Sequence, residues 1–233
     1  MDSAVQDAFK LLSLLEKVQA EPELYYRGVA GCDDEILRVG AWCALFDLNK
    51  VRIADCETIL SLSHHGAIRQ RLFEFYEGLY EYELAAEMVA TSSPVSDDPL
   101  QLEIEGRLAL DDDKQLRGAE ARFFATCASK HLLTASSLTE ASKGWRPSLV
   151  WLVRAMIIFP VDEKAANRFV RTLAEANQFN AVARFATLLA KVDKLPYTRD
   201  AFQAWALQGM GEAQSTIDII GRLLSTTLPD GGK

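Results

Sequence analysis

The sequence predicts an all-α fold, an α-solenoid of about six antiparallel helix pairs with capping helices at its N-terminus. Three observations lead to this fold class. Each of the seven prolines lies between apolar-periodic segments or at the start of one, because proline disrupts a helix interior but fits its first turn. Between these breaks, apolar residues follow the period of one helix face, as in Phe169, Val170, Leu173 and Ala174. Turn signals also recur at a fixed spacing, which indicates stacked helical hairpins.

The breaks divide the chain into predicted helices. Asp98-Pro99 has the form of an N-cap followed by a first-turn proline. The acidic runs Asp33-Asp34-Glu35 and Asp111-Asp112-Asp113 place carboxylates where a helix start favours them. We expect helices over residues 2–20, 22–30, 33–47, 51–62, 65–77, 79–90, 98–110, 114–129, 131–143, 147–159, 162–176, 179–192, 197–209 and 212–226.

The turns inside successive helix pairs give the repeat length. They fall near Leu79, Asp112, Trp145, Gln178 and Gly211, each 33 residues after the one before. One hairpin cannot bury its own apolar stripe, so stacked neighbours must continue the core. An irregular helical bundle is the alternative architecture.

Two helices of about a dozen residues, repeating over residues 33–227, resemble tetratricopeptide repeats. Trp205 and Gly209 have the W-x-x-L-G spacing of that family, with Gln208 in place of the leucine. Gly221 stands where the family has a small residue in its second helix, whereas Glu212 replaces the usual tyrosine. The resemblance implies a right-handed superhelix that binds other proteins and carries no catalytic site.

The expected organisation is one continuous superhelical domain with two segments. Residues 1–30 are predicted to form N-terminal capping helices, 31–92 a first repeat segment and 98–228 a second. The longest break between periodic segments, residues 91–98, is the candidate hinge.

Composition and charge narrow the class of protein. The chain has a net charge of −8, with an acidic N-terminal half and a mildly basic C-terminal half. No signal segment or membrane-length apolar run is visible, since the apolar stretch 149–159 is too short to cross a bilayer. The four cysteines form no C-x-x-C pair. We therefore expect a cytoplasmic protein with reduced thiols and no membrane partner.

The sequence contains none of the familiar phosphate-binding, metalloprotease or nucleophile-elbow motifs, so we expect no enzyme activity and no cofactor. His64 and His65 are predicted to lie at a solvated helix start. Adjacent residues of a helix point to different sides, so the pair is not expected to chelate one ion. Cys127 and His131, four residues apart, could supply half of a zinc site on one helix face. The sequence offers no second pair of ligands, and we predict no metal.

The best candidate for a contact surface is the aromatic and acidic segment 72–87. One helical stripe cannot bury all its aromatic residues, and tyrosines suit binding surfaces because they have an apolar body and a polar tip. The alternative is that these rings fill the interface between adjacent hairpins. The predicted partner-binding residues are Phe73, Tyr76, Glu77, Tyr80, Glu81, Tyr82 and Glu83.

These features favour a protein-interaction module, an adaptor or chaperone-like scaffold that binds a basic, partly apolar peptide or protein segment. A first alternative is a self-assembling structural subunit, in which the acidic half of one chain meets the basic half of another. A second is an RNA-binding helical repeat, which the acidic balance disfavours.

Overall fold

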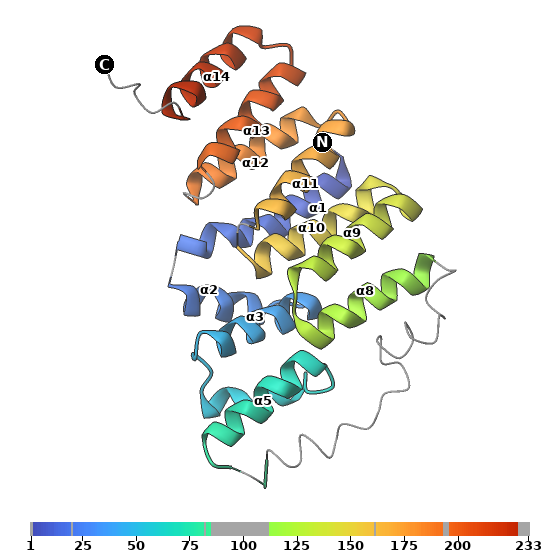
Figure 1. Cartoon of the computed structure of the whole chain (residues 1–233), viewed down its shortest axis with the longest axis vertical. Coiled ribbons are helices and arrows are strands. Elements are labelled where there is room, and N and C mark those ends of the chain that lie inside the picture. Colours follow the sequence, from blue (N-terminus) through green and yellow to red (C-terminus); the bar gives the residue numbers. More distant parts are fainter. Residues whose placement is uncertain are drawn as a thin grey trace. The chain divides into compact units, whose positions relative to one another are not determined.

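A computed structural model of the chain describes residues 2–19, 21–81, 83–84, 112–160, 162–192 and 196–227 (Figure 1). Over these ranges the chain is helical and contains no strand, which confirms the all-α class. The α-helices are α1 (Ser3–Leu12), α2 (Pro22–Ala30), α3 (Glu35–Asp47), α4 (Cys56–Leu60), α5 (Gly66–Gly78), α8 (Asp112–Thr126), α9 (Ser129–Lys143), α10 (Trp145–Ile158), α11 (Glu163–Glu175), α12 (Phe179–Lys191), α13 (Pro196–Gly209) and α14 (Ala213–Thr227). No helix in the described ranges is both long and apolar enough to cross a membrane.

Most helix bounds lie within a few residues of those predicted, with two differences. The predicted helix 2–20 is α1 followed by a 3₁₀ helix, η1 (Ser13–Gln19). The predicted helix 51–62 is a 3₁₀ helix, η2 (Ile53–Asp55), leading into the short α4. The predicted helix 98–110 and most of 79–90 lie outside the described residues.

One of the two predicted acidic caps can be compared with the structure. The Asp34 side chain accepts a hydrogen bond from the Leu37 amide at 3.1 Å and so caps α3. The side chains of residues 111–113 lie outside the described part of the chain.

A recurring backbone conformation marks helix ends along the chain. Positive φ values of 55°, 63°, 84°, 56° and 82° occur at Asn49, Tyr80, Gly144, Asn177 and Gly211, after α3, α5, α9, α11 and α13. At four of them, the amide of the next residue donates to a carbonyl five residues back, as when Glu81 N bonds Tyr76 O at 3.0 Å. This is the Schellman motif, in which a left-handed residue satisfies the last carbonyls of a helix. The turns predicted near Leu79, Gln178 and Gly211 therefore coincide with this way of ending a helix.

The described chain divides into two compact units. The first comprises residues 1–19 and 145–233, and the second comprises residues 20–144. The segment predicted to form an N-terminal cap, residues 1–30, is thus shared between them: α1 and η1 belong to the first unit and α2 to the second. The predicted hinge at 91–98 lies outside the described residues.

The first unit is built on helix α10. Its buried residues lie on nearly every side of the helix, as expected of a helix enclosed by neighbours. Within this unit α10 packs against α1 and α11, and α11, α12, α13 and α14 then pack successively in chain order. A chain of aromatic rings joins them: Phe9 contacts Phe169 (centroids 6.3 Å apart), Phe169 contacts Phe185 (5.0 Å), and Phe185 contacts Phe202 (6.2 Å).

The second unit is a series of helices in which each packs against the next. Helix α2 lies against α3, α3 against α5, α5 against α8, and α8 against α9. Their shared core contains fully buried Leu37, Ile68, Leu72, Phe123 and Leu132.

Candidate functional site

The predicted contact segment begins on helix α5 of the second unit. Its residues Ile68, Leu72 and Tyr76 share one face and are buried. The helix ends at Gly78, and Tyr80 takes the left-handed position of its Schellman motif. Glycine is usual there, because a Cβ atom costs about 1 kcal/mol in this conformation. Yet the Tyr80 side chain is 77% exposed. Helix geometry thus presents a large aromatic ring to solvent at the end of α5.

The structure divides the predicted partner-binding residues into three groups. Glu77, Tyr80, Glu81 and Glu83 are exposed, and Phe73 is half-buried. Tyr76 is part of the core: burial and a hydrogen bond with Cys56 raise its pKa to about 12. Tyr82 lies outside the described residues. Four acidic or aromatic side chains can therefore meet a partner without any change in packing.

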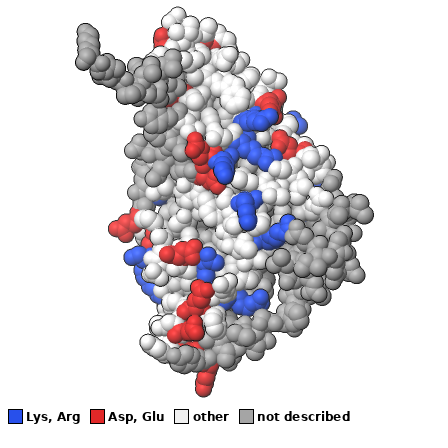
Figure 2. Space-filling model, in the orientation of Figure 1, with Lys and Arg blue, Asp and Glu red and all other residues white. Residues whose placement is uncertain are grey.

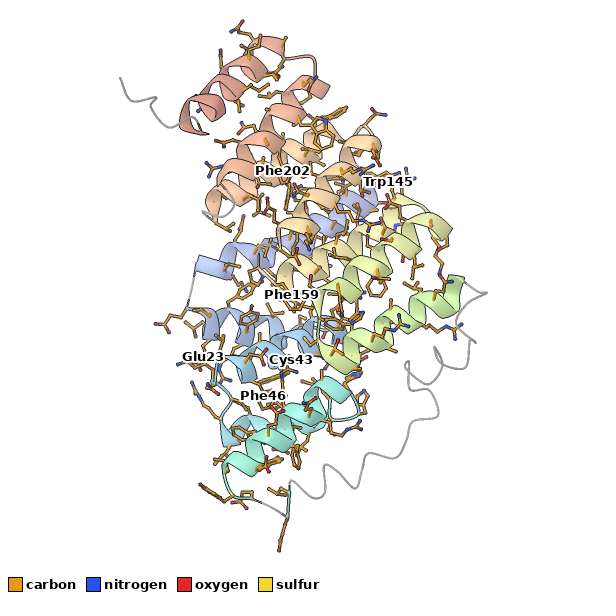
Figure 3. All side chains as sticks on the ribbon, in the orientation of Figure 1. Glu23, Cys43, Phe46, Trp145, Phe159 and Phe202 are labelled. Carbon is orange, nitrogen blue, oxygen red and sulfur yellow. The ribbon has the colours of Figure 1, made fainter. Side chains whose placement is uncertain are left out.

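Beside this segment, helices α3 and α5 enclose a hollow of about 240 Å³. Its walls are aromatic: Phe46 of α3, which is labelled in Figure 3, meets Phe75 of α5 edge to face, with the ring centroids 6.0 Å apart. The residues that line it are Phe46, Asp47, Asn49, Val51, Arg71, Glu74 and Phe75. The left-handed Asn49 turns the chain back after α3 and so brings Val51 to the hollow.

An ion pair holds one wall of the hollow in place. Arg71 Nε and Nη2 donate to the two carboxylate oxygens of Asp47, at 2.9 and 3.2 Å, while Nη1 donates to the carbonyl of Ala67. Burial alone would lower the pKa of Arg71, but the hydrogen bonds to Asp47 raise it. Because Arg71 and Asp47 neutralise each other, Glu74 sets the charge of the hollow, and its wall is acidic.

Sequence reasoning missed the α3 half of this hollow. Asp47 and Arg71 are 24 residues apart, and no local period relates them; only the packing of α3 on α5 brings them together. The usable signal was Phe75, an aromatic residue in α5 outside its buried stripe of Ile68, Leu72 and Tyr76.

A second group of polar side chains lies at the opposite end of α5. His64 and His65 lie in the turn before the helix, with His65 as its N-cap in an extended conformation. The centroids of their two rings are only 3.9 Å apart. The prediction that the two point to different sides was wrong, because it assumed helical backbone at both positions.

Glu35, the first residue of α3, completes this group. Its Oε1 lies 3.5 Å from His64 Nε2 and 3.1 Å from His65 Nε2. The hydrogen bond with His65 lowers the pKa of Glu35. Burial lowers the pKa of His65, although its bond to Glu35 opposes this. The Phe124 ring of α8 stacks on His65, with centroids 4.0 Å apart and 13° between the planes.

Cys127 and His131, considered from the sequence as half of a zinc site on one helix face, do not lie on one helix. Cys127 lies between α8 and α9 with φ of 52°, so the two residues do not share a continuous helix. The Cys127 thiol instead faces Cys43 of α3, and their hydrogen bond and burial raise the pKa of Cys43. Within the described ranges, the His64, His65 and Glu35 cluster is the one group of three side chains placed to share a metal ion.

Comparison with known proteins gives no further guide to function. No protein-family model, no curated protein and no solved structure matches the chain.

Proposed function

We propose that the chain is a non-enzymatic protein-interaction module of the tetratricopeptide-like kind, and that the α3–α5 hollow binds a basic peptide segment carrying an apolar side chain. Support for the repeat architecture comes from helices that pack on their neighbours in chain order and from the Schellman helix ends at Asn49, Tyr80, Asn177 and Gly211. The observation that carries the binding proposal is the hollow itself, an aromatic-walled space with an acidic rim.

The lining favours an apolar side chain as the anchor. Phe46 and Phe75 are half-buried, so each keeps apolar surface accessible to solvent. Packing an aliphatic or aromatic side chain against these two rings removes that surface from water, which is worth about 25 cal/mol per Å² before the costs of ordering a peptide. Leu48 and Leu79, at the C-terminal ends of the same two helices, are also exposed.

The charges around the hollow favour a basic peptide. Glu74 lies in its lining, and Glu77, Glu81 and Glu83 follow along α5 and beyond its end, all of them exposed. The cation of the lining, Arg71, is already neutralised by Asp47. Lysine or arginine residues flanking the apolar anchor would therefore meet unbalanced carboxylates, which speeds association and makes affinity depend on salt.

Affinity selection from a randomised peptide pool tests this proposal on the full-length chain. We expect enrichment of peptides rich in lysine and arginine with one bulky apolar residue. The same selection carried out on the Glu74→Lys variant should not enrich such peptides. Glu57→Lys makes the same charge change on α4 of the same unit, at an exposed position outside the hollow, and should retain them.

The enriched peptide then tests the aromatic wall. Phe75→Ala should weaken its binding about tenfold or more, or roughly 1.4 kcal/mol, as is typical for an aromatic anchor at an interface. Circular dichroism of the variant verifies that it is folded. Enrichment of acidic peptides, or equal enrichment on wild type and Glu74→Lys, would contradict the proposal.

The C-terminal hairpin supports a second candidate function, self-association. In α14, Thr216 and Ile219 are buried, whereas Ile217 (60% exposed) and Ile220 form a second apolar stripe at the surface. Trp205 of α13 is also exposed, and it lies as many residues before the turn at Gly211 as Ile217 lies after it. On the face shown in Figure 2, few charged side chains lie over these two helices.

Mass measured in solution separates this candidate from assembly driven by charge. An apolar contact through α14 should persist at high salt and be lost in Ile217→Glu, whereas contacts between acidic and basic halves should dissociate as salt rises. Gln203→Glu, which adds the same charge at an exposed position of α13, is the control. A monomer at all salt concentrations would exclude both forms of self-assembly.

A further inference from the structure

The cluster of His64, His65 and Glu35 has no role in the proposed peptide binding. His64 is 61% and Glu35 47% exposed, whereas the His65 side chain is 10% exposed. The cluster therefore opens to solvent on one side and is fixed on the other by the stacking of His65 on Phe124. Two of the three histidines in the chain meet at this point.

The distances within the cluster match those between two ligands of one metal ion. Two ligand atoms bound to zinc at about 2.05 Å and at the tetrahedral angle lie about 3.4 Å from each other. The histidine nitrogens lie 3.5 and 3.1 Å from Glu35 Oε1, and all three ligand atoms lie within 4.8 Å of one another. An ion could thus be bound with small rotations of the exposed side chains.

The donor types select the class of ion. Two imidazole nitrogens and one carboxylate oxygen suit zinc and its neighbours in the first transition series, whereas calcium and magnesium prefer oxygen ligands alone. Three protein ligands also leave a coordination position free for water, as in open zinc sites.

The backbone fixes two of the ligands before any ion binds. Asp34 caps α3 through the Leu37 amide and so sets the position of Glu35, the residue that follows. His65 is the N-cap of α5, and its ring packs on Phe124 of α8. Preorganised ligands reduce the ordering cost of binding. Arg38, one helical turn after Glu35, places a positive charge near the cluster and opposes any cation, so the ion must be held by direct ligation.

We propose that His64, His65 and Glu35 bind one divalent transition-metal ion of the zinc class. The alternative is a hydrogen-bonded cluster that binds no ion, in which Glu35 serves only to pair with the two histidines. The two differ in whether the full-length chain takes up zinc in a saturable way.

Calorimetric titration of the chelator-treated full-length chain with Zn²⁺ alone tests the proposal. We expect one ion per chain, and a loss of affinity of at least about tenfold in both His64→Gln and Glu35→Gln. Both side chains are exposed, so these variants should fold. His131→Gln, which changes the one histidine outside the cluster, should bind like wild type.

Cobalt provides a readout of the ligands themselves. Co²⁺ bound at this cluster should give visible absorption bands that disappear in His64→Gln and persist in His131→Gln. Absence of saturable Zn²⁺ binding, or equal affinity in wild type and His64→Gln, would overturn the proposal. Neither result depends on the peptide-binding function, because the hollow lies at the other end of α5.

Discussion

Arg27 Nη1 and Nη2 donate to the two carboxylate oxygens of Asp55, each at 3.0 Å, and so tie helix α2 to the start of α4. The same guanidinium donates through Nε to Glu23 at 3.0 Å and through Nη2 to the carbonyl of Lys50. A planar guanidinium matches a carboxylate in this two-point geometry, which a lysine cannot reproduce. One side chain thus joins α2, the turn after α3 and η2.

Replacing Arg27 by methionine should destabilise the protein by about 1–2 kcal/mol, because the mostly buried Asp55 carboxylate loses its two-point partner. Glu23 keeps its contacts with Arg52 and Lys50. The denaturant midpoint of unfolding measures the change. Arg171→Met is the control, because the pair of Arg171 with Glu175 is largely exposed and its loss should cost less than about 0.5 kcal/mol. Equal destabilisation by the two variants would contradict a structural role for Arg27.

The same pair predicts how stability depends on pH. The hydrogen bonds from Arg27 lower the pKa of Asp55 below its ordinary value of 3.8. At pH values between the lowered pKa of the folded chain and 3.8, the folded chain binds fewer protons than the unfolded chain. Stability therefore rises with pH in this range. The contribution is complete above about pH 5 and is lost as the pH falls through 3.8 to the folded pKa.

Unfolding in urea at a series of pH values tests this dependence. The difference in stability between wild type and Asp55→Asn should be constant above about pH 5 and shrink as the solution becomes more acidic. A difference that stays unchanged into strong acid would show that the Asp55 carboxylate makes no charge-dependent contribution.

Tyr80→Gly should separate stability from binding. Glycine adopts the left-handed conformation of residue 80, with φ of 63°, without the Cβ penalty. The variant should therefore be more stable by about 1 kcal/mol, as seen in a higher thermal midpoint. It should also bind the peptide selected on the α3–α5 hollow more weakly, since the exposed ring at the end of α5 is lost. Unchanged affinity would remove Tyr80 from the contact surface.

The sequence predicted helix positions well because the signals that end a helix are local. Asp34 caps its own helix, and Asn177 and Gly211 adopt positive φ as asparagine and glycine readily do. Tyr80 is the exception, since its residue type gives no sign of the left-handed conformation. The prediction of a turn near Leu79 came from spacing alone.

The candidate sites were harder to predict because their residues come from different helices. Arg71 of α5 contacts Asp47 of α3 only because the two helices pack together. Glu35 of α3 likewise contacts His64 and His65, just before α5, only through this packing. Local reasoning about His64 and His65 also failed because a turn, and not a helix, carries both rings. Periodicity relates residues within a helix and contains no information about such pairs.

Two glycines singled out in the sequence have opposite surroundings, and substituting each by alanine tests what glycine does there. A Cβ atom at Gly209 would collide with the ring of Phe179, whereas one at Gly221 would meet no atom within 4 Å. Alanine favours a helix over glycine by about 1 kcal/mol where space allows. We therefore expect Gly221→Ala, within α14, to raise stability by about 0.5–1 kcal/mol. Gly209→Ala should lower it by about 1–3 kcal/mol, because Phe179 must move out of a packed hairpin. The denaturant midpoints of unfolding measure the stability change in each variant. Stabilisation by Gly209→Ala would mean that Phe179 does not pack against the backbone at this position.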